Sequence, residues 1–266
     1  MTDTRPIGVF DSGIGGLGAV KELRRLIPNE DIVYFGDTGR VPYGSKSPET
    51  ITRYAREDVK FLLGFDVKAI VAACGTVSAV ALDKIRPDIP VPTFGVIDGA
   101  VRSAAGATKN GNVAVIGTKA TVESGIFEKK LRAYQNVENV ISRACPLFVY
   151  LVECGFTDRD NSVTKSVCES YLSDIKNSGA DTLILGCTHF PIISDIISDT
   201  IPGVTLIDPA KEAARELAGK LPNIGASPNG IGHVRYFVSD DAESFSASAK
   251  IFVGPEEKIS ATAVKL

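Results

Sequence analysis

The stretch Thr182–Pro191, TLILGCTHFP, decides the fold of this chain. Its apolar run ends at a glycine, and the final proline opens a helical pattern. A short apolar run bounded by Gly and Pro is typical of a buried parallel strand, and Pro is common at the start of a helix. Cys187, Thr188 and His189 are therefore expected at the carboxyl end of a strand, where open α/β sheets bind ligands.

An earlier stretch, AIVAACGT over 69–76, has the same order of an apolar run, a cysteine (Cys74) and a threonine (Thr76). Around the two stretches, apolar runs alternate with helical patterns, and the alternation begins again near residue 112. In each half, the first strand is followed by a hydroxyl-rich Gly turn and the third by a cysteine. This pattern predicts an α/β fold of two pseudo-symmetric lobes, each a mainly parallel sheet flanked by helices, with the active site in the cleft between them.

The expected strands are 6–11, 31–36, 69–73, 93–97, 112–116, 137–143, 182–186, 204–207 and 233–239. The expected helices are 17–27, 49–64, 77–85, 99–107, 123–134, 147–154, 160–177, 192–201, 210–221 and 241–252. We expect a loop over 39–48, a linker over 222–232 and a tail after the last helix.

Composition limits the function classes. The 266 residues carry a net charge of −3, and the basic residues are scattered, so nucleic acid is not an expected partner. The sequence has no run of 18 or more apolar residues, so no membrane span is expected. The first strand begins too early for a signal peptide, so a cytoplasmic location is expected. Five cysteines without a CxxC pair favour reduced thiols over a disulfide framework or a metal site.

The glycines of Gly13–Gly18 match the GxGxxG pattern of dinucleotide-binding turns, and Asp37 follows about 20 residues later. Asp11 at the mouth of this turn would repel a pyrophosphate, and the pattern leaves the two strand-end cysteines unexplained. A nicotinamide enzyme therefore stays as an alternative, and no cofactor is expected.

The positions of the five cysteines in the sequence divide them into two groups. Cys145, Cys154 and Cys168 lie outside any motif and are expected to be small core residues. Cys74 and Cys187 each precede a helix, whose N-terminus favours the thiolate by lowering the thiol pKa. His233 is expected to be structural, on an edge-like strand.

Two opposed thiols without a cofactor suit amino-acid racemisation. One base removes the α-proton from one face, and an acid returns a proton to the other face. Hydroxyls and backbone N–H groups at helix starts would bind the substrate's carboxylates.

The chain resembles the glutamate racemases of the cofactor-independent aspartate/glutamate racemase family. The resemblance covers most of the chain and rests on segments 10–17, 35–38, 41–44, 74–76, 116–122 and 186–191. It implies that Cys74 is the base acting on D-glutamate and Cys187 the base acting on L-glutamate. Asp11 would assist near Cys74, and His189 and Glu153 near Cys187.

The resemblance also implies which residues bind substrate: Asp11, Ser12, Pro42, Tyr43, Gly44, Gly75, Thr76, Thr118, Thr121, Thr188 and His189. It further implies a homodimer, a supply of D-glutamate for peptidoglycan in the cell wall, and lobes of 1–97 plus 208–266 and of 98–207.

One departure is Gly75, where the family has Asn. Loss of the amide removes a substrate contact worth about 1.5–3 kcal/mol, so Gly75→Asn is predicted to raise kcat/KM for glutamate. The departure leaves open a racemase or decarboxylase of a related acid, and a weakly catalytic binding or regulatory homologue.

Overall fold

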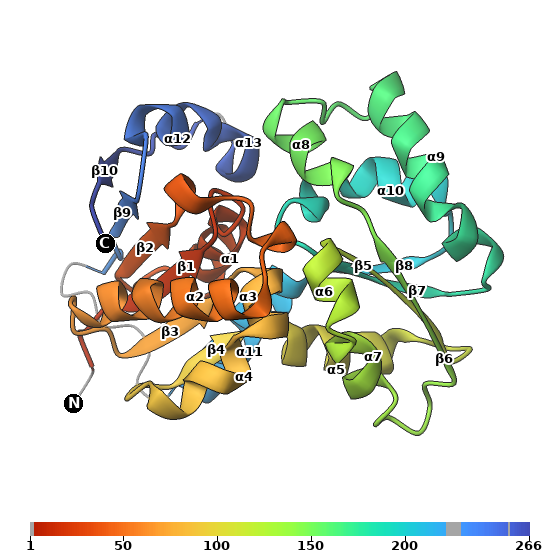
Figure 1. Ribbon diagram of the computed structural model, residues 1–266, viewed down its shortest axis with the longest axis horizontal. Coiled ribbons are helices and arrows are strands. Elements are labelled where there is room, and N and C mark those ends of the chain that lie inside the picture. Colours follow the sequence, from red (N-terminus) through yellow and green to blue (C-terminus); the bar gives the residue numbers. More distant parts are fainter. Residues whose placement is uncertain (1–2, 222–229, 255) are drawn as a thin grey trace.

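The structure is a computed structural model that describes residues 3–221, 230–254 and 256–266. Its strands form two separate sheets (Figure 1). The strands are β1 (Ile7–Asp11), β2 (Ile32–Gly36), β3 (Ala69–Ala72), β4 (Thr93–Gly95), β5 (Asn112–Gly117), β6 (Asn139–Ala144), β7 (Thr182–Gly186), β8 (Thr205–Ile207), β9 (Val234–Val238) and β10 (Ala261–Ala263).

Helices follow nearly every strand of the first eight. The α-helices are α1 (Leu17–Leu26), α2 (Pro48–Leu63), α3 (Gly75–Val80), α4 (Leu82–Ile85), α5 (Ile97–Ala107), α6 (Lys119–Glu123), α7 (Ile126–Leu131), α8 (Leu147–Glu153), α9 (Ser162–Asn177), α10 (Ser194–Thr200), α11 (Pro209–Lys220), α12 (Ala242–Ser248) and α13 (Lys250–Val253). The 3₁₀ helices are η1 (Thr38–Arg40), η2 (Tyr43–Ser45), η3 (Arg86–Asp88) and η4 (Phe190–Ile193).

The two sheets share one topology. The order in the first is β10-β9-β2-β1-β3-β4 and in the second β6-β5-β7-β8, and the strand pairs of the described residues are parallel. Strands β2-β1-β3-β4 therefore correspond to β6-β5-β7-β8. We call the first sheet with its helices the first lobe and the second sheet with its helices the second lobe. The predicted α/β architecture of two similar lobes is confirmed.

The lobes are joined by packing as well as by the chain. One hydrophobic core runs from Leu17 of α1 through Leu217 of α11 to Leu185 of β7. Separate cores lie under α2 and α3 in the first lobe and under α5 and α7 in the second. Because α11 packs against α1, α5 and β7, it belongs to the junction between the lobes. The predicted boundaries at 97/98 and 207/208 stay a prediction.

Several predicted elements are interrupted. The helix expected over 123–134 is wrong in its bounds. Thr118 caps an earlier helix, α6, by accepting from Thr121 N–H, and Gly125, at φ 65° in the left-handed region, separates α6 from α7. The helices expected over 77–85, 192–201 and 241–252 are likewise divided into two elements each. The loop over 39–48 contains η1 and η2.

The C-terminal region also differs from the expectation. The predicted tail contains β10, which pairs with β9, so β9 is an internal strand rather than an edge strand. His233 precedes β9, is exposed, and donates its N–H to Asp31 Oδ1 at 2.8 Å. The predicted linker lies mostly outside the described residues. No helix of the described residues is long and apolar enough to cross a membrane.

Candidate active site

A cavity of about 280 Å³ is lined by residues of both lobes. Most of the predicted site residues line it: Ser12, Pro42, Tyr43, Gly44, Cys74, Gly75, Thr76, Thr118, Glu153, Cys187, Thr188 and His189. Asp11 and Thr121 do not line the cavity. Asp11 directly precedes Ser12, and Thr121 contacts Thr118, and both Ser12 and Thr118 line it. The structure therefore brings together at one cavity the carboxyl ends of β3 and β7, the two equivalent strands that precede the cysteines.

Cys74 caps the start of α3 and is 4% exposed. Its Sγ lies 3.6 Å from Ser12 Oγ. Burial, with the nearby charge of Asp11, raises the pKa of Cys74 to about 12. The expectation that the helix start lowers this pKa is wrong, because desolvation of a thiolate outweighs the short helix. Cys74 is a protonated thiol at neutral pH.

Asp11 ends β1 behind Ser12 and is fully buried. Its Oδ2 accepts from Gly13 N–H at 2.9 Å, while Oδ1 has no hydrogen-bond partner among the described residues. Burial raises the pKa of Asp11. A buried carboxyl oxygen without a partner is costly, and such groups concentrate at functional sites.

Cys187, His189 and Glu153 form a chain from the cavity toward solvent. Cys187 Sγ lies 3.9 Å from His189 Nδ1, and His189 Nε2 lies 2.8 Å from Glu153 Oε1. Burial opposes protonation of His189, but its bonds to Cys187 and Glu153 raise its pKa to about 10. His189 is therefore an imidazolium at neutral pH. The Glu153 side chain is 41% exposed, so it connects this pair to water.

Three threonine hydroxyls connect the lobes beside the cavity. Thr76 Oγ1 lies 3.0 Å from Thr118 Oγ1, which lies 2.9 Å from Thr121 Oγ1. Thr76 follows β3 in the first lobe, whereas the other two follow β5 in the second. Thr121 therefore orients Thr118 rather than facing the cavity.

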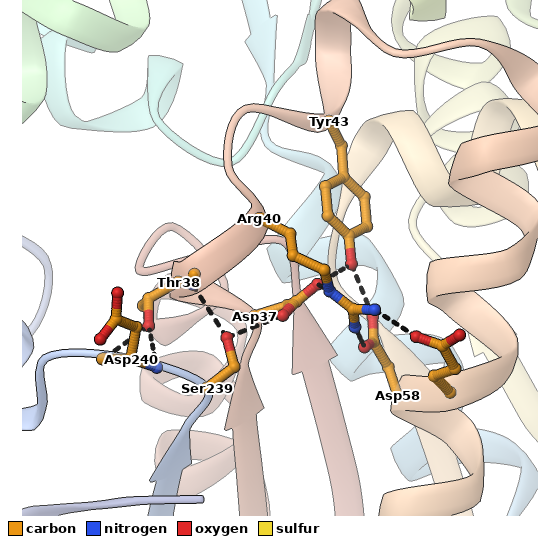
Figure 2. Close-up of polar contacts among 9 residues, drawn as sticks. Asp37, Thr38, Arg40, Tyr43, Asp58, Ser239 and Asp240 are labelled. Atoms are coloured by element: carbon orange, nitrogen blue, oxygen red, sulfur yellow. Dashed lines mark hydrogen bonds and ion pairs between the residues drawn. The ribbon is translucent and has the colours of Figure 1, made fainter. Parts of the chain in front are cut away.

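Tyr43 lines the cavity, and its hydroxyl points toward Asp37 and Asp58 (Figure 2), neither of which lines the cavity. The hydroxyl contacts Asp37 Oδ2 and lies 3.1 Å from Asp58 Oδ2. Arg40 lies between the same carboxylates, with Nε 2.5 Å from Asp37 Oδ2 and a nitrogen 3.1 Å from Asp58 Oδ1. Ser239 Oγ donates to Asp37 Oδ1 at 2.7 Å. Any contact of Tyr43 with substrate would come from its backbone, because the hydroxyl is occupied.

The contacts of this cluster favour a neutral Asp58. A phenol carries one proton, and Tyr43 makes its shorter contact with Asp37, so its 3.1 Å contact with Asp58 Oδ2 is best satisfied by a proton on Asp58. Asp58 can donate only as a neutral carboxylic acid. Consistent with this, burial and the neighbouring Asp37 raise the pKa of Asp58 well above its ordinary value. The cluster therefore holds the loop of η2 at the cavity with one buried carboxyl kept neutral.

The glycine-rich turn after β1 packs against the second lobe. A Cβ on Gly15 would lie 2.8 Å from Thr188 Cβ and 2.9 Å from His189 Cε1. The space in which a dinucleotide's pyrophosphate would have to approach this glycine is filled by Thr188. Close packing between the lobes accounts for this glycine, and the nicotinamide alternative loses its main support.

Three residues that no sequence motif predicts also line the cavity: Pro146, Val149 and Tyr150. They lie on or directly before α8 at helical spacing from Glu153. Because positions three and four apart share a helix face, the assignment of Glu153 could have predicted them. Gly13, Val41, Ser45 and Lys119 also line the cavity.

Two equivalent parallel sheets, with a cysteine after the third strand of each facing one cavity, define a two-lobe α/β enzyme with paired thiols. The family model for Asp/Glu/Hydantoin racemase matches residues 18–217, and the chain belongs to this family. It is 44% identical to the glutamate racemase of Geobacter metallireducens over 94% of this chain and 93% of that protein.

Solved structures agree with this assignment. The glutamate racemase isoform of Bacillus anthracis matches with a TM-score of 0.92 and 36% identity, covering 98% of this chain and 97% of that one. The glutamate racemase of Francisella tularensis, solved in complex with D-glutamate, matches with a TM-score of 0.90 and 36% identity, covering 98% of each chain.

Proposed function

We propose that this chain interconverts L- and D-glutamate by a two-base mechanism in which Cys74 and Cys187 act on opposite faces of the substrate. The observation that carries the proposal is the placement of the two thiols after β3 and β7, with both lining one cavity. Similarity to glutamate racemases over nearly the whole chain supports glutamate as the substrate.

The two faces differ in the protons that they hold. Starting from L-glutamate, Cys187 takes the α-proton as a thiolate, which a neighbouring imidazolium such as His189 stabilises. Cys74, whose pKa is raised to about 12, gives its thiol proton to the other face of the α-carbon. One proton leaves and one arrives, so the product is D-glutamate, and the reverse reaction exchanges the roles.

Neighbouring residues then return the protons. Glu153 and His189 connect Cys187 to solvent, and Asp11 lies behind the Cys74 side of the cavity. The hydroxyls of Ser12, Thr76 and Thr188 line the cavity and supply donors for the substrate's carboxylates.

The wider role follows from the same proposal. D-glutamate made by this chain would supply peptidoglycan synthesis, and the enzyme would act in the cytoplasm as a homodimer. The proposed proton transfers take place between the substrate and the side chains of Cys74 and Cys187.

Exchange of the α-proton tests the proposal. Each enantiomer of glutamate is incubated in D₂O with the wild-type protein and a reducing agent, and deuterium incorporation and inversion are followed by NMR. We expect both from both enantiomers. Cys74→Ala should abolish inversion and D-glutamate exchange, and Cys187→Ala should abolish inversion and L-glutamate exchange.

The expectation that Cys154 is a core residue is wrong, because its side chain is exposed, whereas Cys145 and Cys168 are buried as expected. Cys154→Ala is therefore the matched control, since this exposed thiol lies outside the cavity lining. Inversion that survives in either active-site variant would refute the two-base assignment. Exchange of the glutamate α-proton without inversion in the wild type would instead favour a reaction that uses a single base.

A further inference from the structure

Gly75, where the resemblance predicts Asn, brings the backbones of the two cysteine-bearing segments close together. It is the first residue of α3, directly after Cys74, and it faces the carbonyl oxygen of Gly186, directly before Cys187. A Cβ on Gly75 would lie within 3.0 Å of that oxygen, a distance that real Cβ atoms essentially never show. The expected gain from Gly75→Asn therefore loses its physical basis, because no side chain fits here without a shift.

Both backbones are held in place by hydrogen-bonded structure, so a local shift of either would break sheet or helix bonds. Gly186 pairs with Gly117 in the second sheet, and a Cβ on Gly186 would itself meet Ile116 O at 2.6 Å. On the other side, Cys74 O accepts from Ser78 N–H at 2.9 Å in the first turn of α3. A side chain at position 75 would therefore have to push the lobes apart.

A second glycine of the first lobe makes the same kind of contact at the cavity. A Cβ on Gly44 would lie 2.7 Å from Thr118 Cβ of the second lobe. Together with the contact of Gly15 against Thr188, this gives three positions around the cavity where the lobes approach through a missing side chain. The lobes therefore approach each other closely at glycines in more than one place around the cavity.

We propose that Gly75 is a positioning residue that sets the distance between the Cys74 and Cys187 thiols by allowing the lobes to meet backbone to backbone. The kinetic part of this inference rests on the proposed function, while the spacing of the lobes does not. A misplacement of about 1 Å can reduce a rate about a hundredfold. Gly75→Ala and Gly75→Asn should therefore lower the kcat for inversion by about tenfold to a hundredfold.

The test compares Gly75→Ala and Gly75→Asn with Gly18→Ala. Gly18 lies in α1 of the same lobe, and a Cβ there would meet nothing within 4 Å. The first readout is alkylation of each cysteine by iodoacetamide, followed by peptide mass spectrometry. Cys74 and Cys187 are 4% and 8% exposed, whereas Cys154 is exposed and serves as the internal reference. The second readout is kcat and KM for inversion of both glutamate enantiomers.

We expect both Gly75 variants to be alkylated several-fold faster at Cys74 and Cys187, relative to Cys154, while Cys145 and Cys168 in the second-lobe core stay protected. We also expect kcat to fall more than KM rises, and Gly18→Ala to match the wild type in both readouts. Unchanged alkylation in the Gly75 variants, or a higher kcat in Gly75→Asn, would overturn the inference.

Alkylation needs no substrate, so it tests the lobe spacing even if the wild type proves inactive on glutamate. If neither Gly75 variant folds, Gly44→Ala tests the same spacing, with faster alkylation of the two cavity thiols expected and unchanged alkylation counting against the inference.

Discussion

Replacement of Asp58 by Asn should leave the loop of η2 in place and change how stability depends on pH. In the wild type, the Asp58 carboxyl accepts from Arg40 and lies 3.1 Å from the Tyr43 hydroxyl, to which a neutral Asp58 would donate its proton. The Asn amide can repeat both bonds, with its N–H donating to the tyrosine oxygen and its carbonyl accepting from the guanidinium. At low pH the free energy of unfolding should therefore change by about 1 kcal/mol or less.

The pH dependence follows from the raised pKa of Asp58. The native state keeps a proton that the unfolded chain loses above its ordinary value of 3.8, so wild-type stability falls as pH rises toward the native pKa. Asn carries no such proton. The variant should therefore gain stability relative to the wild type by about 1.4 kcal/mol for each pH unit while native Asp58 stays protonated. The relative gain therefore accumulates above pH 3.8 and levels off once the pH passes the native pKa of Asp58.

Urea unfolding of both proteins at a series of pH values measures this difference, and the other titrating groups largely cancel because the chains share them. Asp37→Asn is the matched control. It removes the charge that faces Arg40 and should cost about 3–5 kcal/mol. A difference between Asp58→Asn and the wild type that stays flat from pH 4 to 8 would show that native Asp58 is ionised, and the hydrogen-bond accounting would be refuted.

Three further changes test other parts of the structure. Glu153→Gln removes the charge beside His189, which lowers the pKa of His189 from about 10 toward its ordinary value. Exchange from L-glutamate should slow about two- to tenfold, whereas exchange from D-glutamate should change less. Equal slowing from both enantiomers would contradict the assignment of Glu153 to the Cys187 face. Protonation of His189 contributes stability that is complete below its ordinary pKa of 6.5 and is lost as pH rises through about 10. The free energies of unfolding of the wild type and His189→Gln, measured by urea titration, should therefore converge over that range. A constant difference between them would contradict the raised pKa. Gly125→Ala places a Cβ in left-handed backbone with nothing within 4 Å, and should cost about 1–2 kcal/mol, or roughly 2–8 °C in Tm, with kcat unchanged; an unchanged Tm would argue against the left-handed conformation.

The strand ends could be predicted because their signal is local. An apolar run followed by Gly186 and Cys187 specifies a buried strand and the point at which it ends, and parallel topology then brings such ends to one edge. The positions of Cys74 and Cys187 around one cavity followed from that reasoning.

The protonation states could not be predicted, because they depend on burial by segments far away in the sequence. The helix start suggested a thiolate at Cys74, whereas desolvation and Asp11 keep the thiol protonated. The direction of the Tyr43 hydroxyl depends on Asp58 of α2 and on Asp37 after β2. The close approach of Gly75 to Gly186 could not be predicted for the same reason, since Gly186 lies more than 100 residues further along the chain.

The pairing of β9 with β2 has a consequence for synthesis of the chain. Ser239, directly after β9, holds Asp37, and the ring of Phe252 stacks edge-on against His189 with centroids 5.4 Å apart. This segment, which leaves the ribosome after both cysteine-bearing segments, therefore supports both sides of the cleft. At about 5–20 residues per second, Cys187 emerges roughly 2–9 seconds before β9, and Cys74 roughly 8–32 seconds before it. Until then β2 is an unpaired sheet edge that can pair with other chains, so aggregation should be greatest in chains that stop short of residue 234.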